Sequence, residues 1–197
     1  MATGLLHVSR RVLAAWLRTS VQHLLTPATD ERHAMRLDFK NFSVEIDAEA
    51  TRKAYEGLPR TDERCSCDGC QNFPLAIGKA LSEEGRRLFE SMGVDPAKAT
   101  EAYVNLARDE GTIFYGAWYH LFGRIERRVE TVPDVTAAVW GRDRERWIGD
   151  NAHIFFADGE GVLLMEDAFR GSADVIQMEL LADVPWVMDG PNPYLDE

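Results

Sequence analysis

The chain has 197 residues, of which 45% are hydrophobic and 28% charged, and its formal net charge is −11. This composition is typical of a soluble globular domain with a substantial core. The acidic excess argues against nucleic acids and anionic membrane surfaces as partners, because both are bound through clustered Lys and Arg. We therefore expect an unidentified protein or small-molecule partner.

Residues 1 to 34 differ in charge from the rest of the chain. They hold four arginines and two acidic residues, so they carry +2 and residues 35 to 197 carry −13. Their apolar residues recur at roughly helical spacing between arginines, which is typical of a transit peptide or a membrane-surface helix. The sharp break favours Met35 as the start of translation over a targeting segment. We interpret residues 1 to 34 as an extension outside the fold.

The domain itself is expected to span residues 35 to 190, followed by a frayed tail at 191 to 197. Residues 35 to 47 alternate between apolar and polar with one slip at Asn41, which predicts a single strand with a bulge. Asp47 is a typical N-cap, and a helix is predicted from it to Gly57. Residues 59 to 64 are polar and predict a loop.

Two further helices are predicted after the cysteines at 65 to 70. Phe73, Ile77 and Leu81 lie on one face of the first. The second begins at the N-cap Ser82 and ends at Gly93. For residues 95 to 110, a short helix and a strand both remain open.

From Gly111 onward, aromatic and β-branched residues predict strands, with Gly116 and Gly123 indicating bulges or close packing. Two apolar runs flank residues 158 to 161 and predict a hairpin. A last strand is expected to end at Pro185, which lacks a backbone N–H. The order predicts an α+β fold in which an antiparallel sheet, mostly C-terminal, is packed on one face by two or three helices.

The three cysteines all lie in the run CSCDGC, at Cys65, Cys67 and Cys70. An odd, closely spaced number does not fit a secreted disulfide framework, so a reducing cytoplasm is expected. Thiolates are strong zinc ligands, and the C-x-x-C spacing lets two sulfurs reach one ion. We predict a zinc site formed by these cysteines and His120. His153 and, more weakly, Asp68 are alternative fourth ligands.

Two other interpretations of the cluster remain open. Cys67 precedes a predicted helix, whose dipole would favour a reactive thiolate, so Cys67 and Cys70 are candidates for a redox pair. A thioredoxin motif, however, follows a strand, and here the approach is polar. The third interpretation is that the cysteines pack the start of a helix as small hydrophobic residues.

The run CSCDGCQNF and the closing IQMELLADVPWV together resemble an uncharacterised bacterial protein family with a C-x-C-x-x-C-x-N-F block and a late strand that ends in Pro-Trp. The resemblance implies a shared site but no particular reaction. It draws attention to Asn72, as a hydrogen-bonding partner of the thiolate loop, and to Phe73, as core beneath it.

The remaining sequence assigns no catalytic residue. Phosphate-binding, nucleophile-elbow and metalloprotease motifs are missing from it, and its acidic turns lack the ligand spacing of a calcium loop. We therefore expect a cytoplasmic domain whose cysteine-rich, zinc-binding loop serves a binding or structural module. The alternative is a thiol-dependent redox or transfer enzyme that uses Cys67 and Cys70.

Overall fold

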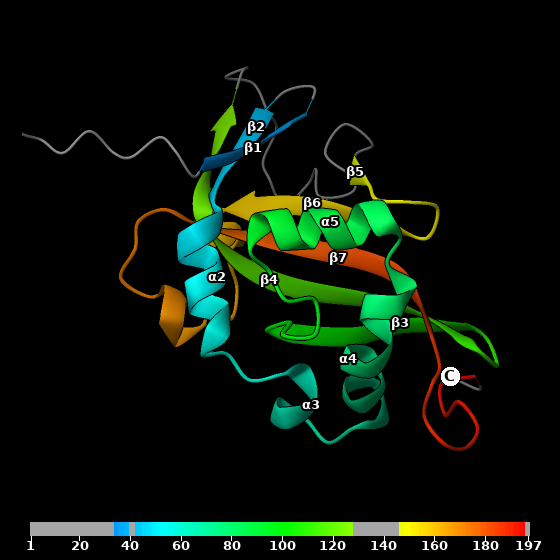
Figure 1. Cartoon of the computed structure of the whole chain (residues 1–197). Coiled ribbons are helices and arrows are strands. Elements are labelled where there is room, and N and C mark those ends of the chain that lie inside the picture. The colour runs from blue at the N-terminus through cyan, green and yellow to red at the C-terminus, as the bar shows by residue number, and fades with distance from the viewer. Residues whose placement is uncertain (1–33, 40–41, 128–145, 196–197) are drawn as a thin grey trace, which may run out of the picture. The chain divides into compact units, whose positions relative to one another are not determined.

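The computed structural model describes residues 34–39, 42–127 and 146–195, which belong to one compact unit, His33–Glu197. Within this part of the chain, seven strands form one antiparallel sheet in the order β1-β2-β4-β7-β6-β5, with β3 paired to β4 (Figure 1). The strands are β1 (Ala34–Asp38), β2 (Phe42–Asp47), β3 (Glu101–Asp109), β4 (Thr112–Arg127), β5 (Arg146–Trp147), β6 (Ala152–Asp158) and β7 (Val175–Pro185). The α+β prediction is confirmed.

The long strand β4 organises the sheet. Its first half pairs with β3, its last residues pair with β2, and β7 follows it along most of its length on the other side. Two glycines permit this crowding. A Cβ on Gly123 would lie 2.3 Å from the backbone oxygen of Glu45, and one on Gly116 would lie 2.2 Å from the Tyr103 ring. Close packing is therefore the reason for both glycines.

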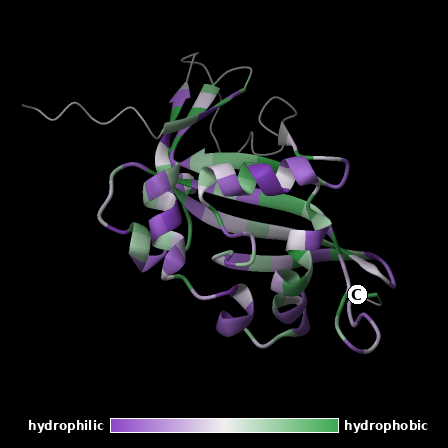
Figure 2. Ribbon diagram, viewed as in Figure 1, coloured by the Kyte–Doolittle hydropathy of each residue, from purple (hydrophilic) through white to green (hydrophobic). Residues whose placement is uncertain are grey.

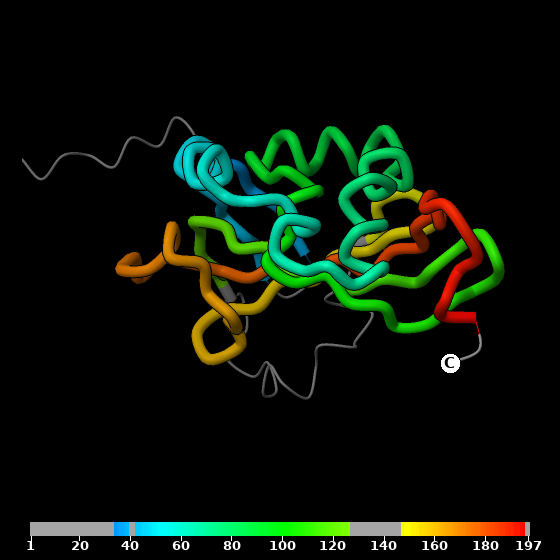
Figure 3. Tube along the Cα trace, turned by 90° about the horizontal axis from the view of Figure 1, so that it is seen from below, coloured from blue at the N-terminus to red at the C-terminus, as the bar shows by residue number. Residues whose placement is uncertain are grey.

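The helices gather along one face of the sheet (Figure 3). They are α2 (Ala48–Glu56), α3 (Thr61–Arg64), α4 (Asp68–Ala80) and α5 (Glu83–Met92). The predicted caps are confirmed: the Asp47 carboxylate accepts from Ala50 N at 2.9 Å, and the Ser82 hydroxyl accepts from Gly85 N at 3.0 Å. Gly93 ends α5 with φ +76°, a left-handed conformation that favours glycine.

The core lies between these helices and the sheet. Phe73 of α4 packs against Tyr115 of β4, and Phe89 of α5 packs against Tyr119 of the same strand. Ile77 of α4 is buried in the same core cluster. Figure 2 shows that β6 and β7 are largely hydrophobic, whereas α2 and α5 alternate between hydrophobic and hydrophilic residues. This is the pattern expected of amphipathic helices that cover a sheet. No helix in the described part of the chain is long and apolar enough to span a bilayer.

The first predicted strand is instead a hairpin of β1 and β2. Phe39 N donates to Phe42 O at 2.9 Å, which closes the turn, and Leu37 pairs with Val44. The prediction of one bulged strand is therefore wrong, and the slip itself, at Asn41, lies outside the described residues. The apolar and polar residues alternate in both β1 and β2 because each strand turns one side toward the core.

The hairpin predicted around residues 158 to 161 is wrong. β6 ends at Asp158, and a short 3-10 helix, Gly159–Gly161, follows it. Both edges of β6 are already occupied, by β5 and β7, so the second apolar run has no strand to pair with. Leu164 of this second run is 61% exposed.

The residues before Gly111, for which a helix and a strand both remained open, form β3, a strand at the edge of the sheet.

Residues 1 to 34 were interpreted as an extension; residues 1–33 lie outside the described residues, and Ala34 is part of β1. Residues 191–195, expected to fray, instead pack on the domain. The Asn192 side chain is buried and donates to Asp109 O at 3.3 Å, and the Tyr194 hydroxyl accepts from Gly69 N at 2.9 Å. Tyr194 therefore lies beside the start of α4.

Candidate metal centre

The three cysteines lie on the connection between α3 and α4. Cys65 follows α3 in an extended conformation, Cys67 is the N-cap residue of α4, and Cys70 lies in the first turn of that helix. The Gln71 side-chain amide donates to Cys65 O at 2.7 Å and to Asp62 O at 2.9 Å. These bonds fold the connection back on α4, so the loop is fixed by its own sequence.

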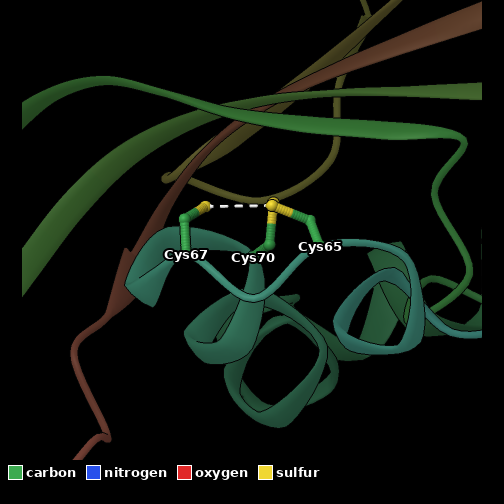
Figure 4. A group of neighbouring side chains, drawn as sticks. All are labelled: Cys65, Cys67 and Cys70. Carbon is green, nitrogen blue, oxygen red and sulfur yellow. Dashed lines mark hydrogen bonds between the residues drawn. The ribbon is translucent and has the colours of Figure 1, made fainter.

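The fold brings the three sulfur atoms together (Figure 4). All three lie within 4.8 Å of one another, and Cys65 Sγ is 3.3 Å from Cys67 Sγ. Sulfurs that bind one tetrahedral zinc ion at about 2.3 Å lie about 3.8 Å apart. The three sulfur atoms are therefore close enough together to bind a single metal ion.

The three thiols have different surroundings. Cys65 and Cys67 are exposed, whereas Cys70 is buried and its thiol donates to Ala102 O of β3 at 3.7 Å. Hydrogen bonds from the Cys67 backbone and thiol lower the pKa of Cys65, and the nearby Glu101 carboxylate opposes this effect. Burial raises the pKa of Cys70. A cation bound by the cluster would favour the thiolate of Cys70, since ligand binding requires deprotonation.

The cysteines form one side of a pocket of about 540 Å³. Its other walls are residues of the edge strand β3, from Glu101 to Ala107, and Tyr194 and Leu195 of the C-terminal segment. Gly69 permits this arrangement, because a Cβ there would lie 3.0 Å from both the Tyr194 hydroxyl and a Val104 methyl. The pocket therefore joins three segments that are distant in the sequence.

The structure does not place His120 with the cysteines. Its Nδ1 lies 3.1 Å from the Thr100 hydroxyl and its Nε2 lies 3.0 Å from Leu163 O, so both ring nitrogens are already engaged. Burial lowers the pKa of His120, which favours the neutral ring. The alternative fourth ligands, His153 and Asp68, do not join the cluster of ligand atoms either. His153 instead lies against the rings of Trp147 and Phe155.

Asn72 has a different role from the one expected. Its amide donates to Pro185 O at 3.0 Å and its oxygen accepts from Val187 N at 2.8 Å, so it joins α4 to the end of β7 and not to the thiolate loop. Phe73 is fully buried, as expected of core. The sequence interpretation missed Glu101 and Tyr194 as pocket residues, because no local pattern links them to the cysteines.

Comparisons of the chain with protein-family models, curated proteins and solved structures found no match. The site must therefore be interpreted from its own geometry. The chain is an α+β protein with a three-cysteine cluster that is able to hold a metal ion and that lines a pocket.

Proposed function

We propose that this chain is a cytoplasmic zinc-binding module, in which Cys65, Cys67 and Cys70 hold the ion beside a binding pocket. The main observation in support of this proposal is that three sulfur atoms lie within 4.8 Å of one another on a hydrogen-bonded loop. Three thiolates form a soft ligand set, which suits zinc far better than calcium or magnesium. A reducing compartment keeps such thiols available for a metal.

The ion would connect separate parts of the fold. Cys65 follows α3, Cys67 begins α4, and Cys70 packs against β3 through Ala102. A metal bound to all three sulfurs would restrain the α3–α4 connection against the edge of the sheet. Binding free energy at such a site adds to the stability of the fold to the extent that the folded chain binds the ion more tightly than the unfolded chain does.

The test is thermal melting and metal analysis of the purified protein, with and without EDTA. We expect about one zinc ion per chain, and a fall in Tm of at least about 6 °C after chelation, which corresponds to roughly 1.5–3 kcal/mol for a chain of this size. Each of Cys65→Ser, Cys67→Ser and Cys70→Ser should lower Tm to a similar extent and lose the response to EDTA. Ser66→Ala, on the same loop, is the matched control and should behave as wild type. A metal-free protein that does not respond to added zinc or to EDTA would overturn the proposal.

A second candidate is a thiol-dependent redox enzyme, because Cys65 Sγ and Cys67 Sγ are only 3.3 Å apart. This pair is exposed, whereas Cys70 of the pair expected from the sequence is buried. Formation of a Cys65–Cys67 disulfide would release two electrons and two protons to a disulfide substrate. Reduction of a model disulfide by metal-free protein, abolished in both Cys65→Ser and Cys67→Ser but kept in Cys70→Ser, would favour this candidate over the zinc module.

A further inference from the structure

We infer that the metal held by Cys65, Cys67 and Cys70 keeps a fourth, exchangeable coordination position that opens into the adjoining pocket and takes a small thiol with a neutral or cationic body. This inference rests on the proposed metal site and adds to it a ligand class and the residue that selects it, Glu101.

The first step is the number of protein ligands. In the part of the chain that the structure describes, the cluster contains three ligand atoms, all of them sulfur. The predicted fourth ligand, His120, has both ring nitrogens engaged by Thr100 and Leu163. Zinc is four-coordinate in proteins, and sites with three protein ligands use water or substrate as the fourth. Among the described residues, the geometry therefore leaves one position for an external ligand.

The second step is the space beside that position. All three cysteines line the pocket of about 540 Å³, which lies within the size range of small-molecule sites. Its walls beyond the sulfurs include Val104 and Leu106 of β3 and Leu195 near the end of the chain, and the last two are exposed apolar side chains. A ligand with a soft donor atom and a short carbon body would fill this space and cover these side chains.

The third step is the charge of the pocket. Glu101 is the only acidic or basic side chain among the described residues that line it. Three thiolates and one divalent cation leave a net charge of −1 at the metal, so an anionic ligand would meet two negative groups. A small pocket with one sign of charge selects against ligands of the same sign. A cationic or neutral thiol is therefore favoured over an acidic one.

The binding step is a ligand exchange without oxidation. The bond between the metal and its water breaks, a bond between the metal and the thiol sulfur forms, and the thiol proton passes to solvent. The soft sulfur donor matches the ligand preference of a thiolate-bound metal.

The experiment uses cobalt(II) in place of zinc in the full chain, under anaerobic conditions, because the visible absorbance of cobalt reports its coordination. The protein is titrated with cysteamine and, separately, with mercaptoacetate, two short thiols of opposite charge. We expect both to change the cobalt spectrum, with cysteamine binding at least about tenfold more tightly, a difference of about 1.4 kcal/mol. In Glu101→Gln this preference should shrink several-fold. Glu110→Gln, which alters an acidic residue outside the pocket lining, is the matched control and should keep it.

The outcomes separate this inference from the proposed function. Failure of the chain to bind cobalt would overturn both. Tight cobalt binding with a spectrum that neither thiol alters at millimolar concentration would overturn only the open position. Weaker cobalt binding in Glu101→Gln, together with a cobalt spectrum that differs from wild type before any thiol is added, would identify Glu101 as the fourth ligand and overturn the open position. Equal binding of the two thiols would overturn the charge selection. Ultrafiltration confirms that the cobalt stays with the protein during each titration.

Discussion

The three cysteines illustrate how the same residue type acquires different properties within six positions. Cys65 is exposed, and hydrogen bonds from Cys67 lower its pKa. Cys70 is buried beside Ala102 O, and burial raises its pKa. Since thiolate is the reactive form, the two residues should differ strongly in reactivity when no metal is bound.

We therefore predict that iodoacetamide modifies metal-free wild-type protein first at Cys65 and last at Cys70. Peptide mass spectrometry after brief exposure near pH 8 would measure the order. The control is the same protein unfolded in urea, where the cysteines should react at similar rates because their surroundings are lost. Modification of Cys70 as fast as Cys65 in the folded protein would contradict the prediction. Added zinc should slow the reaction at all three positions.

For single residues, the sequence predicted the cysteine cluster, but it did not predict the residues that surround the cluster in the fold. Short spacing alone brings Cys65, Cys67 and Cys70 together, so their proximity was predictable. The position of His120 depends on the pairing of β3 with β4 and on the loop that carries Leu163, neither of which a local pattern specifies. The same reason explains why Glu101 was missed.

At the scale of elements, Asn72 connects the first turns of α4 to the end of β7. It is fully buried, and its amide is bonded to Pro185 O and Val187 N. It also donates to the Tyr115 hydroxyl at 3.3 Å, which in turn donates to Gly69 O of the same helix. This network positions the helix that carries Cys67 and Cys70.

Asn72→Ala should destabilise the fold by about 2–4 kcal/mol, because it leaves the Pro185 carbonyl and the Val187 amide without their partner. Urea unfolding monitored by circular dichroism would measure the change. Asn105→Ala, at an exposed position on β3, is the control and should stay within about 0.5 kcal/mol of wild type. A loss below about 1 kcal/mol in Asn72→Ala would show that the network contributes little.

The ends of helices and strands were predicted correctly from the sequence where a single residue determines them. Asp47, Ser82 and Gly93 were recognisable as caps, and Pro185 as the last residue of a strand, because each acts through its own backbone or side chain. The hairpin predicted after β6 failed because the partner of a strand is decided by distant segments. β7, which begins fourteen residues after the predicted turn, takes the edge of β6.

At the scale of the whole molecule, packing of helices on one face of the sheet removes aromatic side chains from solvent. The buried tyrosines are Tyr55 of α2 and Tyr115 and Tyr119 of β4. In the C-terminal segment, Tyr194 lies against the start of α4. Burial raises the pKa of all five tyrosines of the chain, the fifth being Tyr103. The ionisation of the five tyrosines therefore reports on whether the fold as a whole is intact.

The sign of the resulting pH dependence is fixed by the direction of these shifts. A phenol whose pKa is higher in the folded than in the unfolded state stabilises the fold fully below the unfolded value of about 10, and this contribution is lost as pH rises above it. We predict that Tm is nearly independent of tyrosine ionisation up to about pH 9.5 and falls steeply above it. Tyrosinate absorbance should appear together with the loss of circular dichroism, while the urea-unfolded protein should titrate near pH 10. Ionisation of several tyrosines near pH 10 in a chain that keeps its circular dichroism would show that the phenols reach water without unfolding, and that the packing of helices on the sheet is looser than the structure describes.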